Sequence, residues 1–163
     1  ARKTAEARQG AYAAAMTLAN LSVAAFGPRV TPINAFVLIG LDLALRDWLH
    51  VWLKPWQMGA LIAITGMLTY ALNPAAGMIS VASSVAFTAA ALVDWATFAR
   101  LRGSWLRRAN GSNLAGAAVD SLLFPTIAFG ALMPDIVAAQ FIAKVAGGAL
   151  WSAILARRGE GAA

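Results

Sequence analysis

The chain has 163 residues, of which 60% are hydrophobic and only 12% are charged. A soluble domain carries roughly a quarter charged residues and cannot hide this much apolar surface, so the composition excludes a soluble protein and predicts an integral membrane protein. With no cysteine and one histidine, disulfide frameworks, thiolate metal sites and histidine clusters are also excluded, and we expect neither a metal nor another cofactor.

Six apolar segments are long enough to be membrane-spanning helices, which need about 20 residues each. Each segment ends at Pro, Gly, Asn or a basic cluster, and the connections between them are short. We predict a single domain over residues 1–163, an all-α integral membrane protein that forms a compact bundle of six transmembrane helices. The predicted spans are residues 10–26, 33–53, 56–72, 76–98, 114–133 and 136–155.

The basic residues outside these spans predict the orientation of the bundle. Only Arg29 falls on one side, and all the others fall on the opposite side: Arg2, Lys3, Arg8, Lys54, Arg100, Arg102, Arg107, Arg108, Arg157 and Arg158. Cytoplasmic loops carry the Lys/Arg excess, so we predict that both termini are cytoplasmic. Topology and anionic lipid account for the net charge of +6, and no nucleic-acid partner is expected.

The first span carries two features at helical spacing. Thr17 and Asn20 lie on one face, where they can contribute to a polar site. Ala11, Ala15 and Ala19 form a ridge of small residues, which indicates close helix packing either inside the bundle or against a partner.

The second span contains charged residues within an apolar stretch. Asp42 and Arg46 are four residues apart, so they share one helix face and can bond to each other. A charge at the middle of a span costs roughly 2.5–3.5 kcal/mol, which requires an inward-facing position. The two residues are either a neutralised pair or part of a polar cavity. Asp47 lies off that face and is expected to be solvated, and His50 is expected at the membrane interface.

Further polar side chains follow in the last three spans. The fourth span carries a stripe in steps of three, four and seven: Ser80, Ser83, Ser84, Phe87 and Asp94. The serines either pack between helices or line a cavity, and Asp94 either belongs to that cavity or meets Arg100 or interfacial water.

In the fifth span Asp120 shares a face with Phe124, and in the sixth Gln140 shares a face with Lys144. Asp120 and Lys144 have no nearby residue of opposite charge in the sequence. They must therefore find a partner across the bundle or bind a ligand.

These residues describe a bundle with an interior of charges, aromatic rings and hydroxyls. The sequence shows no catalytic triad, phosphate-binding loop or extramembrane domain. Such an interior suits the binding and passage of a polar solute, and we do not expect an enzyme.

Four segments, taken in order, resemble a known family: FVLIGLDLALRDWLH (36–50), SVASSVAFTAAALVDWATFARLR (80–102), AVDSLLFPTIAFG (118–130) and QFIAKVAGGALW (140–151). They resemble the vitamin uptake transporter (VUT) family, also called queuosine-precursor transporters, over residues 33 to 155. The resemblance implies a six-helix importer of 7-deazaguanines, chiefly 7-cyano-7-deazaguanine. It also implies a location in the cytoplasmic (inner) membrane of a bacterium, where the protein could be encoded by a phage. It places family positions on Asp42, Arg46, Ser83, Asp94, Asp120 and Lys144.

The predicted substrate fits these side chains. A carboxylate, from Asp94 or Asp120, can accept from the ring N–H and the amino group of a deazaguanine together. Lys144, Arg46, a serine or Asn20 can donate to its carbonyl and nitrile, and Phe87, Phe124 or Trp95 can stack on its ring. The predicted substrate-binding residues are therefore Asn20, Asp42, Arg46, Ser83, Ser84, Phe87, Asp94, Asp120, Phe124 and Lys144.

Two alternatives remain at this stage. The chain could be the substrate-binding subunit of an energy-coupling-factor vitamin importer, which would dock on an ATP-hydrolysing partner. It could also be a holin-like pore-forming protein without a solute site. Besides the solute and the lipid bilayer, the expected partners are a second copy of the chain or an energising subunit.

Overall fold

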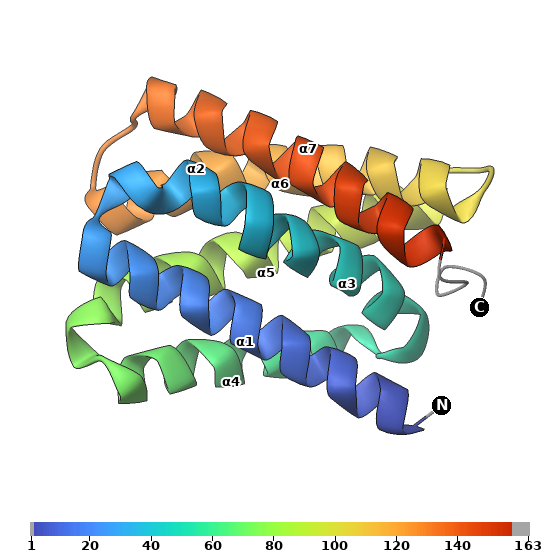
Figure 1. Ribbon diagram of the computed structural model, residues 1–163, viewed down its shortest axis with the longest axis horizontal. Helices are drawn as coiled ribbons and strands as arrows, with labels where there is room; N and C mark the ends of the chain where they lie inside the picture. The colour runs from blue at the N-terminus through green and yellow to red at the C-terminus, as the bar shows by residue number, and fades with distance from the viewer. Residues whose placement is uncertain (1, 158–163) are drawn as a thin grey trace.

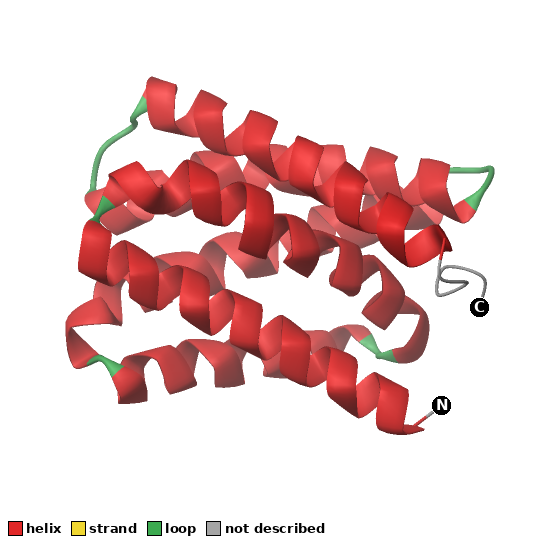
Figure 2. Ribbon diagram, in the orientation of Figure 1, coloured by secondary structure: helices red, strands yellow, loops and turns green. Residues whose placement is uncertain are grey.

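The computed structural model describes the backbone of residues 2–157 and the side chains of residues 6–157 except 47, 48, 50 and 51. The side chains of Asp47 and His50, and the whole of Arg158, lie outside the described residues. Within the described chain every regular element is helical, and short turns join the helices (Figure 2). The all-helical fold predicted from composition is confirmed.

The helices run roughly side by side along the long axis of the molecule, as Figure 1 shows. In chain order the elements are α1 (Arg2–Phe26), η1 (Pro28–Val30), α2 (Thr31–Asn34), η2 (Ala35–Ile39), α3 (Gly40–Trp52), α4 (Pro55–Leu72), η3 (Pro74–Ala76), α5 (Gly77–Arg100), α6 (Trp105–Phe129) and α7 (Pro134–Arg157). α5 and α6 form an antiparallel hairpin, and α7 packs against both α6 and the path of α2, η2 and α3. The apolar core forms where α1, α3, α4 and α5 meet, around Tyr12, Leu43, Ile62 and Phe87.

Two helices begin at least eight residues before their predicted spans. α1 starts at Arg2, and α6 starts at Trp105 instead of residue 114. The basic stretch after Arg100 was predicted to be a connection, but most of it is the first turns of α6. The Ser104 hydroxyl caps this helix by accepting from the Arg107 backbone N–H at 3.4 Å. Basic side chains at a helix surface are compatible with helix formation, so charge alone is a poor sign of a loop.

The second predicted span is one continuous path but not one regular α-helix. Between α2 and α3 the residues Ala35–Ile39 form a π-helical segment, η2. A π-helical turn changes the usual backbone pairing, and the Val37 carbonyl in it accepts a hydrogen bond from Trp151 Nε1 on α7 at 3.2 Å. The irregular turn is thus held by a side chain of the helix packed beside it.

Glycines allow this path to approach α7 closely. A Cβ added to Gly40 would lie 2.6 Å from the backbone carbon of Gly147, and a Cβ added to Gly147 would collide with the Phe36 carbonyl oxygen. Small residues commonly permit such backbone contact between helices in membranes. The π-helical segment and α7 therefore pack backbone against backbone.

The surface of the bundle is apolar enough to face lipid. Large hydrophobic side chains that are more than half exposed include Phe26, Ile33, Trp56, Ile64, Met67, Met78 and Ile142. Four described stretches are long and apolar enough to cross a membrane: Pro28–Arg46, Pro74–Arg100, Trp105–Phe129 and Pro134–Arg157. α1 and α4 do not meet the same criterion of length and mean hydropathy, so the spans at 10–26 and 56–72 remain predictions.

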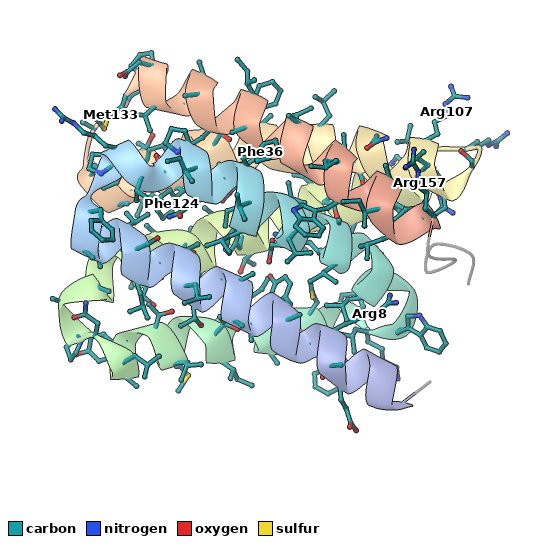
Figure 3. The ribbon with its side chains drawn as sticks, in the orientation of Figure 1. Arg8, Phe36, Arg107, Phe124, Met133 and Arg157 are labelled. Atoms are coloured by element: carbon teal, nitrogen blue, oxygen red, sulfur yellow. The ribbon has the colours of Figure 1, made fainter. Side chains whose placement is uncertain are left out.

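Most of the described basic side chains outside the predicted spans gather at one end of the bundle. α1 begins and α7 ends at that end, and the connections from α3 to α4 and from α5 to α6 lie there too (Figure 1). Arg8, Arg107 and Arg157 lie toward this end, whereas Phe124 and Met133 lie toward the other (Figure 3). The clustering of basic residues expected from the sequence is therefore present in the fold.

The small-residue ridge of α1 packs mainly inside the bundle. Ala15 and Ala19 are each only 4% exposed, whereas Ala11 is exposed. Of the two uses considered for this ridge, internal packing holds for Ala15 and Ala19.

Candidate functional site

The centre of the site is the ammonium group of Lys144 on α7, which is 2% exposed. Its Nζ lies 2.8 Å from Oδ2 of Asp120 on α6 and donates to Oε1 of Gln140 at 2.8 Å and to Oγ of Ser121 at 3.2 Å. An ammonium has three N–H donors, so this geometry engages all of them. Asp120 and Lys144, which lack a neighbour of opposite charge in the sequence, thus pair with each other across two helices.

Two polar atoms of this group have no hydrogen-bond partner among the described residues. They are Oδ1 of Asp120, an acceptor, and Nε2 of Gln140, a donor, and both are buried. Buried polar groups are nearly always hydrogen-bonded in proteins, so each unsatisfied atom needs an explanation. Because both residues border a cavity, a bound solute can provide the missing partners.

That cavity lies between α1, α2, η2, α5, α6 and α7 and contains about 320 Å³ of empty space, part of it open to the outside. Its lining consists of Ala19, Asn20, Val23, Thr31, Asn34, Ala35, Ile39, Ser83, Phe87, Asp120, Phe124, Gln140 and Lys144. Pockets for small molecules typically combine such apolar walls with a few polar groups. The α1 and α6 residues in this lining come from the later parts of their helices, so the cavity lies in the half of the bundle away from the basic end.

Six of the ten predicted binding residues line this cavity: Asn20, Ser83, Phe87, Asp120, Phe124 and Lys144. They come from α1, α5, α6 and α7, which are separated along the chain and are brought together only by the fold. The two phenyl rings and the Asp120–Lys144 pair supply apolar and polar walls to the same space.

Asp42 and Arg46 form a second buried ion pair, behind the cavity wall. Arg46 Nη2 donates to Asp42 Oδ2 at 2.7 Å, and both side chains are fully buried. The i, i+4 pairing predicted from the sequence is confirmed. Neither residue lines the cavity, but the Arg46 guanidinium lies 5.5 Å from the centre of the Phe87 ring, which does. The pair therefore supports the cavity wall from behind through Phe87.

Asp94 is deeply buried between α5 and α6, with no exposed surface. A Cβ on Gly116 would lie 3.3 Å from the Asp94 Cβ, so α6 covers this part of α5 closely. Of the alternatives considered for Asp94, contact with interfacial water does not hold, because the side chain has no exposed surface and α6 covers it. Asp94 is not among the residues that line the cavity.

Ser84 and Trp95 also lie away from the cavity. Ser84 points toward Gly66 on α4 and borders a groove on the outside of the bundle. Trp95 is 47% exposed and borders another outer groove. Successive residues of an α-helix are turned by about 100°, and here that turn directs Ser84 toward α4 while Ser83 lines the cavity. The prediction that Ser84 belongs to the site finds no support in this geometry.

Three polar residues of the lining were not predicted for the site: Thr31, Asn34 and Gln140. Asn34 Nδ2 donates to the Ala19 carbonyl at 3.2 Å and to Ser22 Oγ at 2.6 Å, which ties α2 to α1 at the cavity. Their positions gave only a weak signal, since Thr31 and Asn34 stand at the edge of a predicted span. Gln140 was detectable through its spacing of four from Lys144.

Comparison with protein families gives one match that covers most of the chain. Residues 31–156 match the family described as "Putative vitamin uptake transporter". The matched region begins at α2 and includes the η2 segment and every cavity residue from α2 onward. Searches among curated proteins and among solved structures found no match.

Proposed function

The chain belongs to the vitamin uptake transporter family, and from that premise we propose that it imports a queuosine precursor, a 7-deazaguanine such as 7-cyano-7-deazaguanine, across the bacterial cytoplasmic membrane. Membership in a transporter family and an apolar helical bundle indicate a membrane transporter. The observation that carries the proposal is a cavity whose lining combines the phenyl rings of Phe87 and Phe124 with Asp120, whose Oδ1 has no partner among the described residues.

The chemistry of a deazaguanine matches this lining. Its flat ring can lie against phenyl rings, which contribute a large apolar contact area. Its ring N–H and amino group are adjacent donors, and an ionised carboxylate is the strongest acceptor available to them. A site that bonds to these donors rejects a solute that lacks them, because its own buried groups would remain unpaired.

The geometry favours Asp120 over Asp94 as the carboxylate that accepts hydrogen bonds from the ring of the solute. Asp120 borders the cavity and keeps Oδ1 unsatisfied, while Oδ2 is held by Lys144. Asp94 is not part of the lining. Lys144 therefore fixes the orientation of the carboxylate and leaves one oxygen for the solute.

The test is uptake in a bacterial strain that cannot make the base and has lost its own transporter. We expect the wild-type chain to restore queuosine in tRNA when 7-cyano-7-deazaguanine is supplied in the medium. We expect Asp120→Ala to reduce uptake at least about a hundredfold, because a charge-assisted hydrogen bond to the solute is lost. Asp135→Ala, an exposed acid at the start of α7, is the matched control and should transport normally.

The proposal fails if the wild-type chain, present in the membrane at normal levels, restores no queuosine. Full uptake by Asp120→Ala would leave transport in place but remove Asp120 from substrate recognition.

The proposed orientation puts the basic end of the bundle in the cytoplasm. The chain has no cysteine, so single cysteines can be introduced without further changes. A cysteine at Arg29 is expected to react with a membrane-impermeant maleimide in intact cells, and one at Arg102 only after the cells are opened. Labelling of Arg102→Cys in intact cells would reverse the orientation.

A further inference from the structure

The direction in which the Gln140 side-chain amide points is fixed by its neighbour. Lys144 is a pure donor, so the atom of the amide that contacts it at 2.8 Å must be the oxygen. The amide nitrogen Nε2 must then point elsewhere, and it has no partner among the described residues. Gln140 is only 1% exposed, so bulk water does not provide that partner freely.

Asp120 is held in the same way by the same ammonium. Its Oδ2 lies 2.8 Å from Lys144 Nζ, and its Oδ1 has no partner in the described part of the chain. One nitrogen atom thus anchors both a carboxylate and an amide that line the cavity. What remains for a solute is one free acceptor and one free donor on two side chains that share one ammonium.

Most of the stronger donors in this wall are engaged with the protein. The three N–H groups of Lys144 are directed to Asp120, Gln140 and Ser121. The amide nitrogens of Asn20 and Asn34 donate to Thr69 and to α1, respectively. Lys144 is therefore a positioning residue, and Gln140 is the donor that has no partner among the described residues and shares the Lys144 ammonium with Asp120.

We infer that Gln140 is a specificity-determining residue: Nε2 of Gln140 donates to a ring carbonyl of the solute while Oδ1 of Asp120 accepts from the ring N–H beside that carbonyl. The pair recognises a lactam edge, in which a donor and an acceptor are neighbours on one ring. This inference rests on the proposed function and specifies the edge of the base to which the transporter hydrogen-bonds. An amino group in place of the carbonyl reverses the polarity of that edge and places two donors against each other.

The first experiment uses the wild-type protein and two analogues that differ at that edge. 7-Deazaguanine carries the lactam, and 2,6-diamino-7-deazapurine carries an amino group and an unprotonated ring nitrogen instead. We expect 7-deazaguanine to compete with uptake of labelled 7-cyano-7-deazaguanine at least about a hundredfold better. Equal competition would mean that water satisfies the two atoms and would overturn the inference.

The second experiment replaces the hydrogen-bond donor of the protein with an acceptor. Gln140→Glu keeps the shape of the side chain and an oxygen for Lys144 but replaces the donor with an acceptor. We expect competition by 7-deazaguanine to weaken about ten- to a hundredfold, and the preference over the diamino analogue to disappear or reverse. Gln57→Glu is the control, because a Glu at this third residue of α4 still accepts from the Lys54 backbone N–H as Gln57 does at 2.8 Å.

The outcomes separate this inference from the proposed function. Uptake by wild type together with an unchanged preference in Gln140→Glu overturns the role of Gln140 and leaves transport of the base intact. Absence of any deazaguanine uptake by wild type overturns both. If Gln140→Glu does not reach the membrane, Gln140→Leu, which removes the donor without adding a charge, takes its place, and an unchanged preference for 7-deazaguanine over the diamino analogue in that variant overturns the inference.

Discussion

Replacing Lys144 with methionine is expected to abolish uptake and to destabilise the bundle by about 3–5 kcal/mol. Among the described residues Lys144 is the ion-pair partner of the Asp120 carboxylate, at 2.8 Å, while the other carboxylate oxygen has no hydrogen-bond partner, and both groups are buried. Without the ammonium, Asp120 would remain as an uncompensated charge inside an apolar bundle. The free energy of unfolding of the purified protein in detergent measures the first effect, and uptake in cells measures the second.

Lys54→Met is the matched control for this change. Lys54 is exposed in the connection between α3 and α4, so the same substitution should alter stability by less than about 0.5 kcal/mol. Wild-type stability in Lys144→Met would show that the ion pair does not form.

A double variant separates the structural role of the pair from its role in transport. Asp120→Asn combined with Lys144→Met leaves no unpaired charge, and neutral replacements of a buried pair are often tolerated. We expect most of the lost stability to return, while uptake stays absent because the carboxylate that reads the solute is gone. Return of uptake together with stability would make the pair purely structural.

The sequence predicted those parts of the site that depend on one helix. Asp42 and Arg46 are four residues apart, which is enough to predict the ion pair that forms at 2.7 Å. The cost of placing a charge in a membrane predicted that Asp120 and Lys144 would be buried and would need partners. That they are partners of each other depends on how α6 packs against α7, which neither segment encodes alone.

The predictions that failed also depend on contacts between different helices. The stripe on α5 places Ser83 and Ser84 on one broad face, and only the position of Gly66 on the neighbouring helix assigns Ser84 to the outside. The π-helical turn was also not predicted, because Ala35–Ile39 contains neither Gly nor Pro and has an ordinary apolar pattern. Its partners, Gly147 and Trp151, lie more than a hundred residues later in the chain.

Gly147→Ala is expected to destabilise the protein by roughly 3 kcal/mol, although it adds a single methyl group. That methyl group would occupy the space of the Phe36 carbonyl oxygen, and backbone cannot move aside as a flexible side chain can. α7 would have to move away from η2, which supplies Ala35 and Ile39 to the cavity wall. We therefore expect uptake to fall as well, even though Gly147 does not line the cavity.

Gly59→Ala makes the identical chemical change in α4, at a position where an added Cβ meets nothing within 4 Å. Alanine is favoured over glycine in a helix by up to about 1 kcal/mol, so this variant should be as stable as wild type or more stable. The two variants are compared by thermal unfolding in the same detergent and by uptake in cells. Similar melting temperatures for Gly147→Ala and Gly59→Ala would contradict the close approach of η2 to α7. A lower melting temperature and lower uptake for Gly147→Ala alone would show that backbone contact at this glycine holds the cavity wall in place.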